Sequence, residues 1–273
     1  MQEAPDELLQ DRDFVHFCIK QNWRSLEYAP LAFRDDPEFM AAACGFATGL
    51  ALVFASERLL DHSGVMLAAV SKNGFNLQFA TSRLKNDHEL VCAAVSNSGF
   101  ALEFASPTLQ DDRLVVLKAV RTNGGALSFA SNHMRDSEEA ALEACRGCGC
   151  ALEFASSRVR GIKDVVLVAV KNDGLALEFA SVGLRNDQQV VVNAVLQSGA
   201  ALEFASETMQ GHRKVVMAAT LQNGFALQFA SITLQNDLDF VQSLEDHSYR
   251  NLVLTDPPQL PRKNIHIVET HGD

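Results

Sequence analysis

Ala101-Leu102-Glu103-Phe104-Ala105-Ser106 is a hexapeptide that recurs complete at 151–156, 176–181 and 201–206, with near copies in the gaps. Its phenylalanine returns with a period of 25 residues at Phe54, Phe79, Phe104, Phe129, Phe154, Phe179, Phe204 and Phe229. Tyr28 extends the series by one step of 26. A fixed period of this size predicts a stacked repeat array, in which each unit buries its apolar face against its neighbours. Positions below are counted from the phenylalanine of each unit, which is position 0.

Polar residues and glycines mark the helix ends within each unit. Position +8 carries an N-cap aspartate at Asp36, Asp87, Asp112, Asp187 and Asp237, and His62 and His212 take the same place. Position +7 is mostly Asp, Asn or Gly, which tolerate the left-handed backbone that ends a helix. Glycine at −5, as in Gly99, is expected to end the other helix in the same way. The pattern therefore predicts two helices in each unit. Helix A runs from about −4 to +6, and helix B runs from about +9 to +19.

The spacing of apolar residues indicates how these helices pack. Val115, Val116, Ala119 and Val120, at +11, +12, +15 and +16, share one face of helix B at 100° per residue. Positions +10, +14 and +17 then face solvent. Helix A is apolar on two sides and leaves only −1, +3 and +6 for solvent, which predicts a middle layer.

These patterns predict an all-α fold, an α-solenoid of about nine 25-residue helix-turn-helix repeats with nine A helices and ten B helices. The strand signature of leucine-rich repeats is absent. We expect an N-terminal extension at 1–10, one continuous array at 11–250, and a Pro-containing tail at 251–273 that leaves the period from Leu252 onwards. The tail contains P-x-x-P-x-K at 258–263, which fits either a ligand of an SH3-like groove or an ordinary disordered tail. Residues 265–268 alternate like a short strand, suited to folding back on the array or to pairing with a partner.

The pattern A-L-E-F-A-S…N-D…V-V-x-A-V…N-G resembles the tandem repeats known as domain of unknown function 4116, over nearly the whole chain. Trp23 in place of the glycine, Pro30 in place of the serine and the 26-residue step depart from the pattern and suit an N-terminal capping unit. The resemblance implies no established catalytic residues, so it assigns no active site.

Composition excludes several classes of partner. A net charge of −11 and a pI near 5.2 argue against nucleic acid or an anionic membrane as the main partner. The uncharged stretch 215–236 has the length of a membrane span, but its polar residues fit the repeat, so we expect no span. The first residues lack the features of a signal peptide, and six cysteines lie mostly at apolar positions, which together suggest an intracellular, cytoplasmic protein with reduced thiols.

Departures at solvent positions are the candidates for partner binding. Position −1 is mostly Glu and +6 mostly Arg, Lys or Gln, a pattern that offsets the helix dipole or forms a charged binding ladder. Around Phe54 both positions are apolar, Val53 and Leu60, which indicates either a covered patch or ordinary surface exposure.

Position +17 of helix B changes from polar through basic to apolar along the array. It runs Ser71, Ser96, Arg121, Arg146, Lys171, Leu196 and Leu221, with Lys118 one turn from Arg121. An acidic peptide or a protein of mixed character would fit such a stripe, although dipole compensation also explains its charges.

One cluster resembles a metal-binding or redox site, and it consists of Cys145, Cys148 and Cys150. Structural zinc needs four ligands, and Cys145 and Cys150 occupy apolar repeat positions, so metal or redox use is the least favoured alternative. No catalytic or phosphate-binding motif is present, so we expect no enzyme activity and no cofactor. The sequence favours a helical-repeat scaffold for protein–protein interaction, with a permanent structural subunit of a larger complex as the alternative.

Overall fold

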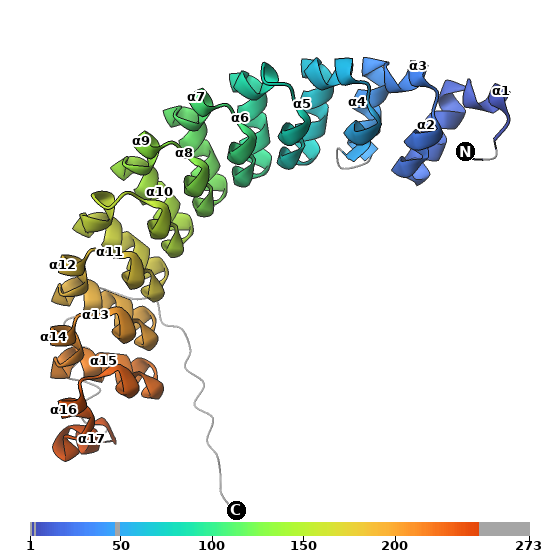
Figure 1. Ribbon diagram of the computed structural model, residues 1–273. Coiled ribbons are helices and arrows are strands. Elements are labelled where there is room, and N and C mark those ends of the chain that lie inside the picture. The colour runs from blue at the N-terminus through green and yellow to red at the C-terminus, as the bar shows by residue number, and fades with distance from the viewer. Residues whose placement is uncertain (1, 3, 47–49, 246–273) are drawn as a thin grey trace, which may run out of the picture.

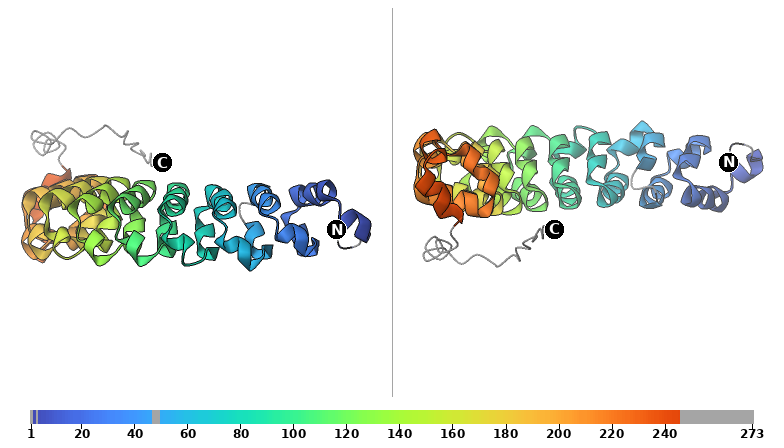
Figure 2. Two further views of the ribbon diagram at one scale, coloured as in Figure 1. Left: turned by 90° about the horizontal axis from the view of Figure 1, so that it is seen from above. Right: turned by 90° about the horizontal axis from the view of Figure 1, so that it is seen from below.

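A computed structural model describes residues 2, 4–46 and 50–245. The units stack in a single row that curves into an arc (Figures 1 and 2). Ten helix-B segments lie in the described part of the chain: α2 (Arg12–Gln21), α4 (Pro37–Phe46), α5 (Ser63–Lys72), α6 (His88–Asn97), α8 (Arg113–Thr122), α10 (Glu138–Gly147), α11 (Lys163–Asn172), α13 (Gln188–Gln197), α15 (Arg213–Gln222) and α17 (Leu238–Glu245). The all-α repeat solenoid is confirmed.

Each helix B begins at the predicted cap and buries the predicted face. The Asp112 carboxylate accepts hydrogen bonds from the N–H groups of Leu114 and Val115, at 2.9 and 3.0 Å. Val116 and Val120 are fully buried, as are their counterparts in the other internal units except Thr220 of α15, which is half-buried. Helices of ten residues are too short to persist alone, so this packing between units stabilises them.

The single helix A of about eleven residues is a wrong prediction, because two short helices replace it. The first is a 3₁₀ helix: η1 (Trp23–Tyr28), η2 (Leu50–Phe54), η4 (Gly74–Phe79), η6 (Gly99–Phe104), η7 (Gly124–Phe129), η8 (Gly149–Phe154), η10 (Gly174–Phe179), η11 (Gly199–Phe204) and η12 (Gly224–Phe229). The second is a short connecting helix: α3 (Leu31–Arg34), η3 (Glu57–Asp61), η5 (Leu84–Asn86), α7 (Pro107–Gln110), α9 (Asn132–Arg135), η9 (Val159–Gly161), α12 (Val182–Arg185), α14 (Glu207–Gln210) and α16 (Ile232–Gln235). The connecting helices lie along the outer side of the arc, and the longer helices extend from them toward its inner side (Figure 1).

An extended pair of residues at +1 and +2 separates the two short helices. Ala105 and Ser106 have ψ angles of 156° and 154°. This geometry lets the Ser106 N–H donate to the carbonyl oxygen of Lys85 in the preceding unit, at 2.8 Å. The same +2 to +6 bond recurs between successive units, for example from Ser131 to Gln110 at 2.9 Å. A continuous helix A would use this N–H internally, so the contact between units decides the break.

The predicted left-handed helix ends are also wrong. Asp111 at +7 has φ −102° and ψ −4°, and its carboxylate accepts instead from Ser131 and His133 of the next unit. Gly99 at −5 opens the 3₁₀ helix η6. Glycine is required there because two backbone segments approach closely. A Cβ at this position would overlap the carbonyl oxygen of Ala119 and lie 3.0 Å from the N of Asn123.

The remaining segments complete the described chain. The N-terminal extension contains a short helix, α1 (Asp6–Leu9), which contacts α2. None of the helices in the described residues has the length and apolar character needed to cross a membrane. The stretch 215–236 instead contributes to α15, η12 and α16. The tail at 251–273, with its P-x-x-P-x-K and strand-like segments, lies outside the described residues.

Candidate interaction surface

We name the exposed side of the successive helices α8, α10, α11, α13 and α15 the helix-B face. Each of these helices packs against the next one in the array. Position +17 therefore occupies an equivalent place on each helix, which aligns the predicted residues Arg121, Arg146, Lys171, Leu196 and Leu221 along one side, with Lys118 one turn from Arg121 on α8. The four basic side chains are exposed, Leu221 is 37% exposed, and Leu196 is half-buried against the core. These six predicted residues thus share one continuous surface.

Glutamates on α10 partly neutralise the basic part of this face. Glu143 lies between Arg121 and Arg146, with N···O distances of 3.4 and 2.6 Å. Glu139 forms a bidentate pair with Arg113 at 2.6 and 2.7 Å, and this hydrogen bonding lowers the pKa of Glu139. The net basic character expected at Arg121 and Arg146 is therefore weaker than the sequence stripe suggests, since exposed pairs of this kind balance each other.

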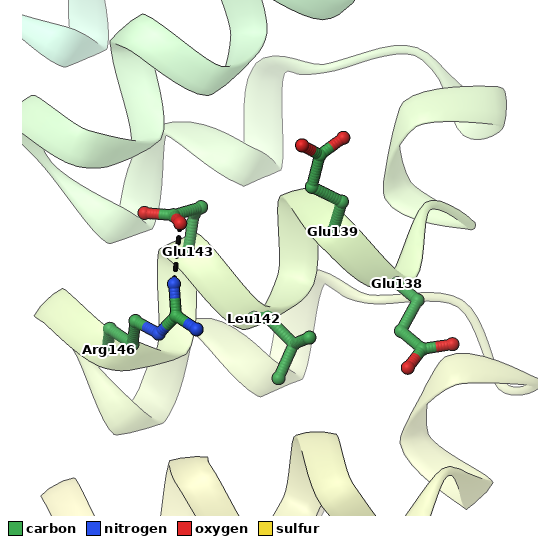
Figure 3. A pocket seen from close by; sticks show the side chains of 5 residues that line it. All are labelled: Glu138, Glu139, Leu142, Glu143 and Arg146. Carbon is green, nitrogen blue, oxygen red and sulfur yellow. Dashed lines mark hydrogen bonds and ion pairs between the residues drawn. The ribbon is translucent and has the colours of Figure 1, made fainter.

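An open depression of about 460 Å³ lies on the exposed side of α10. It is lined by Glu138, Glu139, Leu142, Glu143 and Arg146. Figure 3 shows the Leu142 side chain between those of Glu138 and Arg146, so the depression combines an apolar base with a charged rim. Such a shallow and open shape suits a protruding side chain of a partner better than a small ligand, which pockets normally enclose.

The C-terminal half of the helix-B face is apolar. Most residues of α11, α13 and α15 at +13, +14 and +17 are apolar and partly or largely buried, and no glutamate stands among them; Asn193 and Lys171 are the polar exceptions, and the apolar members are Leu167, Val168, Val192, Leu196, Met217, Ala218 and Leu221. Lys171 marks the border between the charged and the apolar halves, and among the described residues no ion pair of its ammonium occurs. The character of the surface thus changes along the array, while the core beneath it stays the same.

Val53 and Leu60 do not join this surface. Val53 lies in η2 and is 60% exposed, whereas Leu60 lies in the connecting helix η3 and packs half-buried against the core. Position +6 is not a solvent position, contrary to expectation. The Nε2 of Gln110, for example, donates to the carbonyl oxygens of Leu102 and Glu103 at 3.1 and 3.2 Å. Val53 and Leu60 therefore do not form an apolar patch on one solvent-exposed side of a helix, contrary to the prediction. Of the two side chains, only that of Val53 is exposed.

The charged residues that line up along the array are not those at −1 and +6 but those at +7, +2 and +4, a ladder that the sequence pattern did not predict. Asp136 at +7 accepts from the hydroxyl of Ser156 and the guanidinium of Arg158, at +2 and +4 of the next unit. Hydrogen bonds of this kind lower the pKa of Asp35, chiefly through Arg58 and then Ser56, and the pKa of Asp136, chiefly through Ser156 and then Arg158. The 25-residue spacing of Asp and Arg signals such a ladder, but only the break after Ala at +1 brings the partners together.

The three clustered cysteines have three different environments. Cys145 is buried in the core, which raises the pKa of its thiol to about 12. Cys150 donates to Asp173 at 2.9 Å, and this hydrogen bond together with burial raises the pKa of its thiol to about 12 as well. Cys148 is half-buried at the turn between α10 and η8. Raised pKa values disfavour the thiolate that metal binding and redox chemistry need. Within the described residues, no group of three His, Cys, Asp or Glu side chains is placed to hold a metal ion.

Segments 1–34, 64–110, 112–160 and 162–210 match the family described as domain of unknown function (DUF4116), and together they cover more than half of the 273 residues. The chain belongs to this family. Each of the three longer DUF4116 segments spans about two of the 25-residue units. Comparison with curated proteins and with solved structures gives no match.

Proposed function

We propose that this DUF4116 protein is a non-enzymatic scaffold that binds a protein partner through the helix-B face. The observation that carries the proposal is the change of that face along an otherwise regular array. Repeat proteins use the extended surfaces of their arrays for binding, since the repeated core leaves outer positions free to vary. The ion pairs of Glu139 and Glu143 support an interaction role, because they fix the carboxylates in place instead of leaving them for acid–base chemistry.

The partner chemistry follows from the two halves of the face. Leu196 and Leu221 offer apolar contact area, and Lys171 beside them offers a cation. A partner segment with apolar side chains and one carboxylate at its edge complements this arrangement. Buried apolar contacts then supply affinity, while Lys171 sets orientation and the rate of association.

Affinity capture with the full chain, followed by titration of each purified partner, tests this proposal. The variant pairs Lys171→Glu with Leu221→Ser, and the control is Val182→Ser, which removes an exposed apolar side chain from the connecting helix α12. We expect at least tenfold weaker binding for the variant and unchanged binding for the control. Equal affinities of the variant and the native chain for every captured partner would show that this surface is the wrong one.

A permanent structural subunit of a larger complex is the second candidate. The described array ends in an apolar surface, where Phe225 and Leu238 are each 82% exposed. A subunit whose end face is buried in an assembly should aggregate or unfold when purified alone. A monomeric, cooperatively folding chain in sedimentation and thermal denaturation experiments would exclude this candidate.

A further inference from the structure

The C-terminal end of the described array lacks the cover that internal units receive. Phe225 at −4 is 82% exposed, whereas the equivalent Phe75 is 37% exposed. Leu227 at −2 is half-buried, while Leu202 at the same position is fully buried. An open depression of about 370 Å³ is lined there by Gly224, Phe225, Leu227, Gln228 and Gln235. We name these five residues the end face.

Internal units show what normally covers this face. The Phe75 ring packs against Phe104, at 0 of the next unit, with centroids 6.3 Å apart. Phe100 packs on Phe129 in the same way, at 6.1 Å. The end face therefore has the shape of a surface that receives one more 3₁₀ helix, with an apolar side chain at position 0 against Phe225.

The repeat register continues into the chain that follows, contrary to the expectation that the period ends at Leu252. One period after Phe229 is Leu254, which places an apolar side chain at position 0. Leu252 then falls at −2, which is leucine in every unit, and Ser248 falls at −6. Two other matches have precedents in single units: Asn251 at −3 matches Asn76, and Val253 at −1 matches Val53. Pro257 at +3 matches Pro107, which opens the connecting helix α7.

Two departures from the repeat also suit a terminal unit. Tyr249 replaces the glycine at −5, which internal units need because a Cβ would overlap the carbonyl oxygen of the following helix B. No helix B is predicted after residue 257, since the core positions +12, +15 and +16 would be the polar residues His266, Glu269 and Thr270. A tyrosine at −5 therefore suits a terminal unit, as Trp23 does at −5 of the first unit, and terminal repeats are commonly atypical.

We propose that residues 248–257 form a tenth 3₁₀ unit that docks on the end face and closes the array. Leu254 covers Phe225, and Leu252 fills the place that leucine occupies at −2 of the other units. The N–H of Asp256 donates to the carbonyl oxygen of Gln235, as Ser231 does to Gln210 at 2.9 Å in the preceding pair. The proposal concerns the end of the array and does not depend on the partner surface of the helix-B face.

Hydrogen–deuterium exchange on the full chain tests the docking. Internal units protect the N–H groups at −3, +1 and +2, as in Ala101, Ala105 and Ser106. We therefore expect Asn251, Thr255 and Asp256 to exchange at least tenfold more slowly than residues 263–272 of the same tail. Equal exchange in the two tail segments would overturn the proposal.

Two substitutions provide a matched comparison. Leu252→Ser is expected to remove the protection of 249–257 and to speed exchange of 224–229 at least tenfold, while 74–200 stays unchanged as an internal reference. Ile267→Ser, an apolar position outside the proposed unit, is expected to change neither segment. Identical effects of the two variants would contradict the docking. Protection of 224–229 that rises with protein concentration would show that a second copy covers the end face, which also refutes the proposal.

Discussion

At the scale of single residues, the glycine at −5 shows how the absence of a Cβ atom lets a 3₁₀ helix and the following helix B approach closely. Gly174 opens η10 at a point where a Cβ would overlap the carbonyl oxygen of Ala194 in α13. The same Cβ would lie 2.9 Å from the N of Ser198. Both neighbours are backbone atoms, so they cannot swing aside as a flexible side chain would. The glycine is thus a packing residue, and the left-handed conformation suggested by its place in the sequence is not its purpose.

Gly174→Ala is expected to destabilise the protein by about 3 kcal/mol, because the added methyl group forces η10 away from α13. Gly147→Ala is the matched control. Gly147 lies in the last turn of α10 with nothing within 4 Å of a Cβ, and alanine is favoured in helices, so a gain of about 0.5 kcal/mol is expected. Urea denaturation of both variants measures these changes. Similar effects of the two substitutions would show that close approach is not the reason for the repeat glycine.

At the scale of single elements, the cap at +8 contributes to each helix B. Asp112→Ala removes the acceptor of the Leu114 and Val115 N–H groups and should cost about 1 kcal/mol. His212 shows the opposite case, because its side chain makes no capping bond and its buried Nδ1 has no hydrogen-bond partner among the described residues. His212→Asp should therefore stabilise α15 by about 1 kcal/mol. Thermal denaturation distinguishes the two signs, and a loss for His212→Asp would refute this account of the cap.

The ladder of aspartates at +7 predicts a dependence of stability on pH. Hydrogen bonds in the folded protein lower the pKa of Asp35, Asp61, Asp111 and Asp136 below the usual value of aspartate. A lowered pKa means that the stabilisation is fully present above the unfolded value of about 4 and is lost as pH falls through the folded values. The melting temperature should therefore fall as pH drops below about 4.

Asp136→Asn should weaken this decline below pH 4, because the variant has one fewer group whose proton affinity changes on folding. Asp164→Asn, at an exposed position of α11 outside the ladder, serves as the control. Melting temperatures between pH 2 and pH 7 provide the measurement. A decline that is as steep in Asp136→Asn as in the native protein would show that the ladder does not carry the effect.

At the scale of the whole molecule, each unit contacts mainly its neighbours, so units should be removable in whole periods. Deletion of residues 132–156 joins Ser131 to Ser157 and keeps the register, and it brings Arg158 to the place from which His133 contacts Asp111. We expect a folded chain with unchanged helicity per residue and a lower melting temperature. Deletion of 132–151 shifts the register and should prevent cooperative folding. Circular dichroism compares the two, and equal behaviour would contradict a modular array.

Much of the fold follows from the sequence because local signals repeat. The cap at Asp112 and the buried stripe of Val115 and Val120 define helix B within a residue or two of its observed bounds. The break inside helix A was missed, although Ser106-Pro107 is a typical helix start. The hexapeptide has a strong helical spacing, and only the bond from Ser106 to Lys85 of the preceding unit reveals why the helix stops.

The candidate surface was predictable in part. The +17 stripe could be read from the sequence because equivalent positions of a repeat must align in space. The partial neutralisation of Arg121 and Arg146 by Glu143 could not, since it depends on which side chains of neighbouring helices meet. Leu60 was misassigned for the same reason, because burial at +6 comes from the adjacent units and not from the spacing within one helix.

The sequence by itself determined the repeat, its period, the capped helix B and the apolar face that joins the units. These features depend on interactions within a few residues, which the order of amino acids states directly. Only the tertiary structure decided the break in helix A, the role of the glycines, the aspartate ladder and the exposed end face. Each of these depends on contacts between atoms about one period apart, and such contacts exist only once the units are stacked.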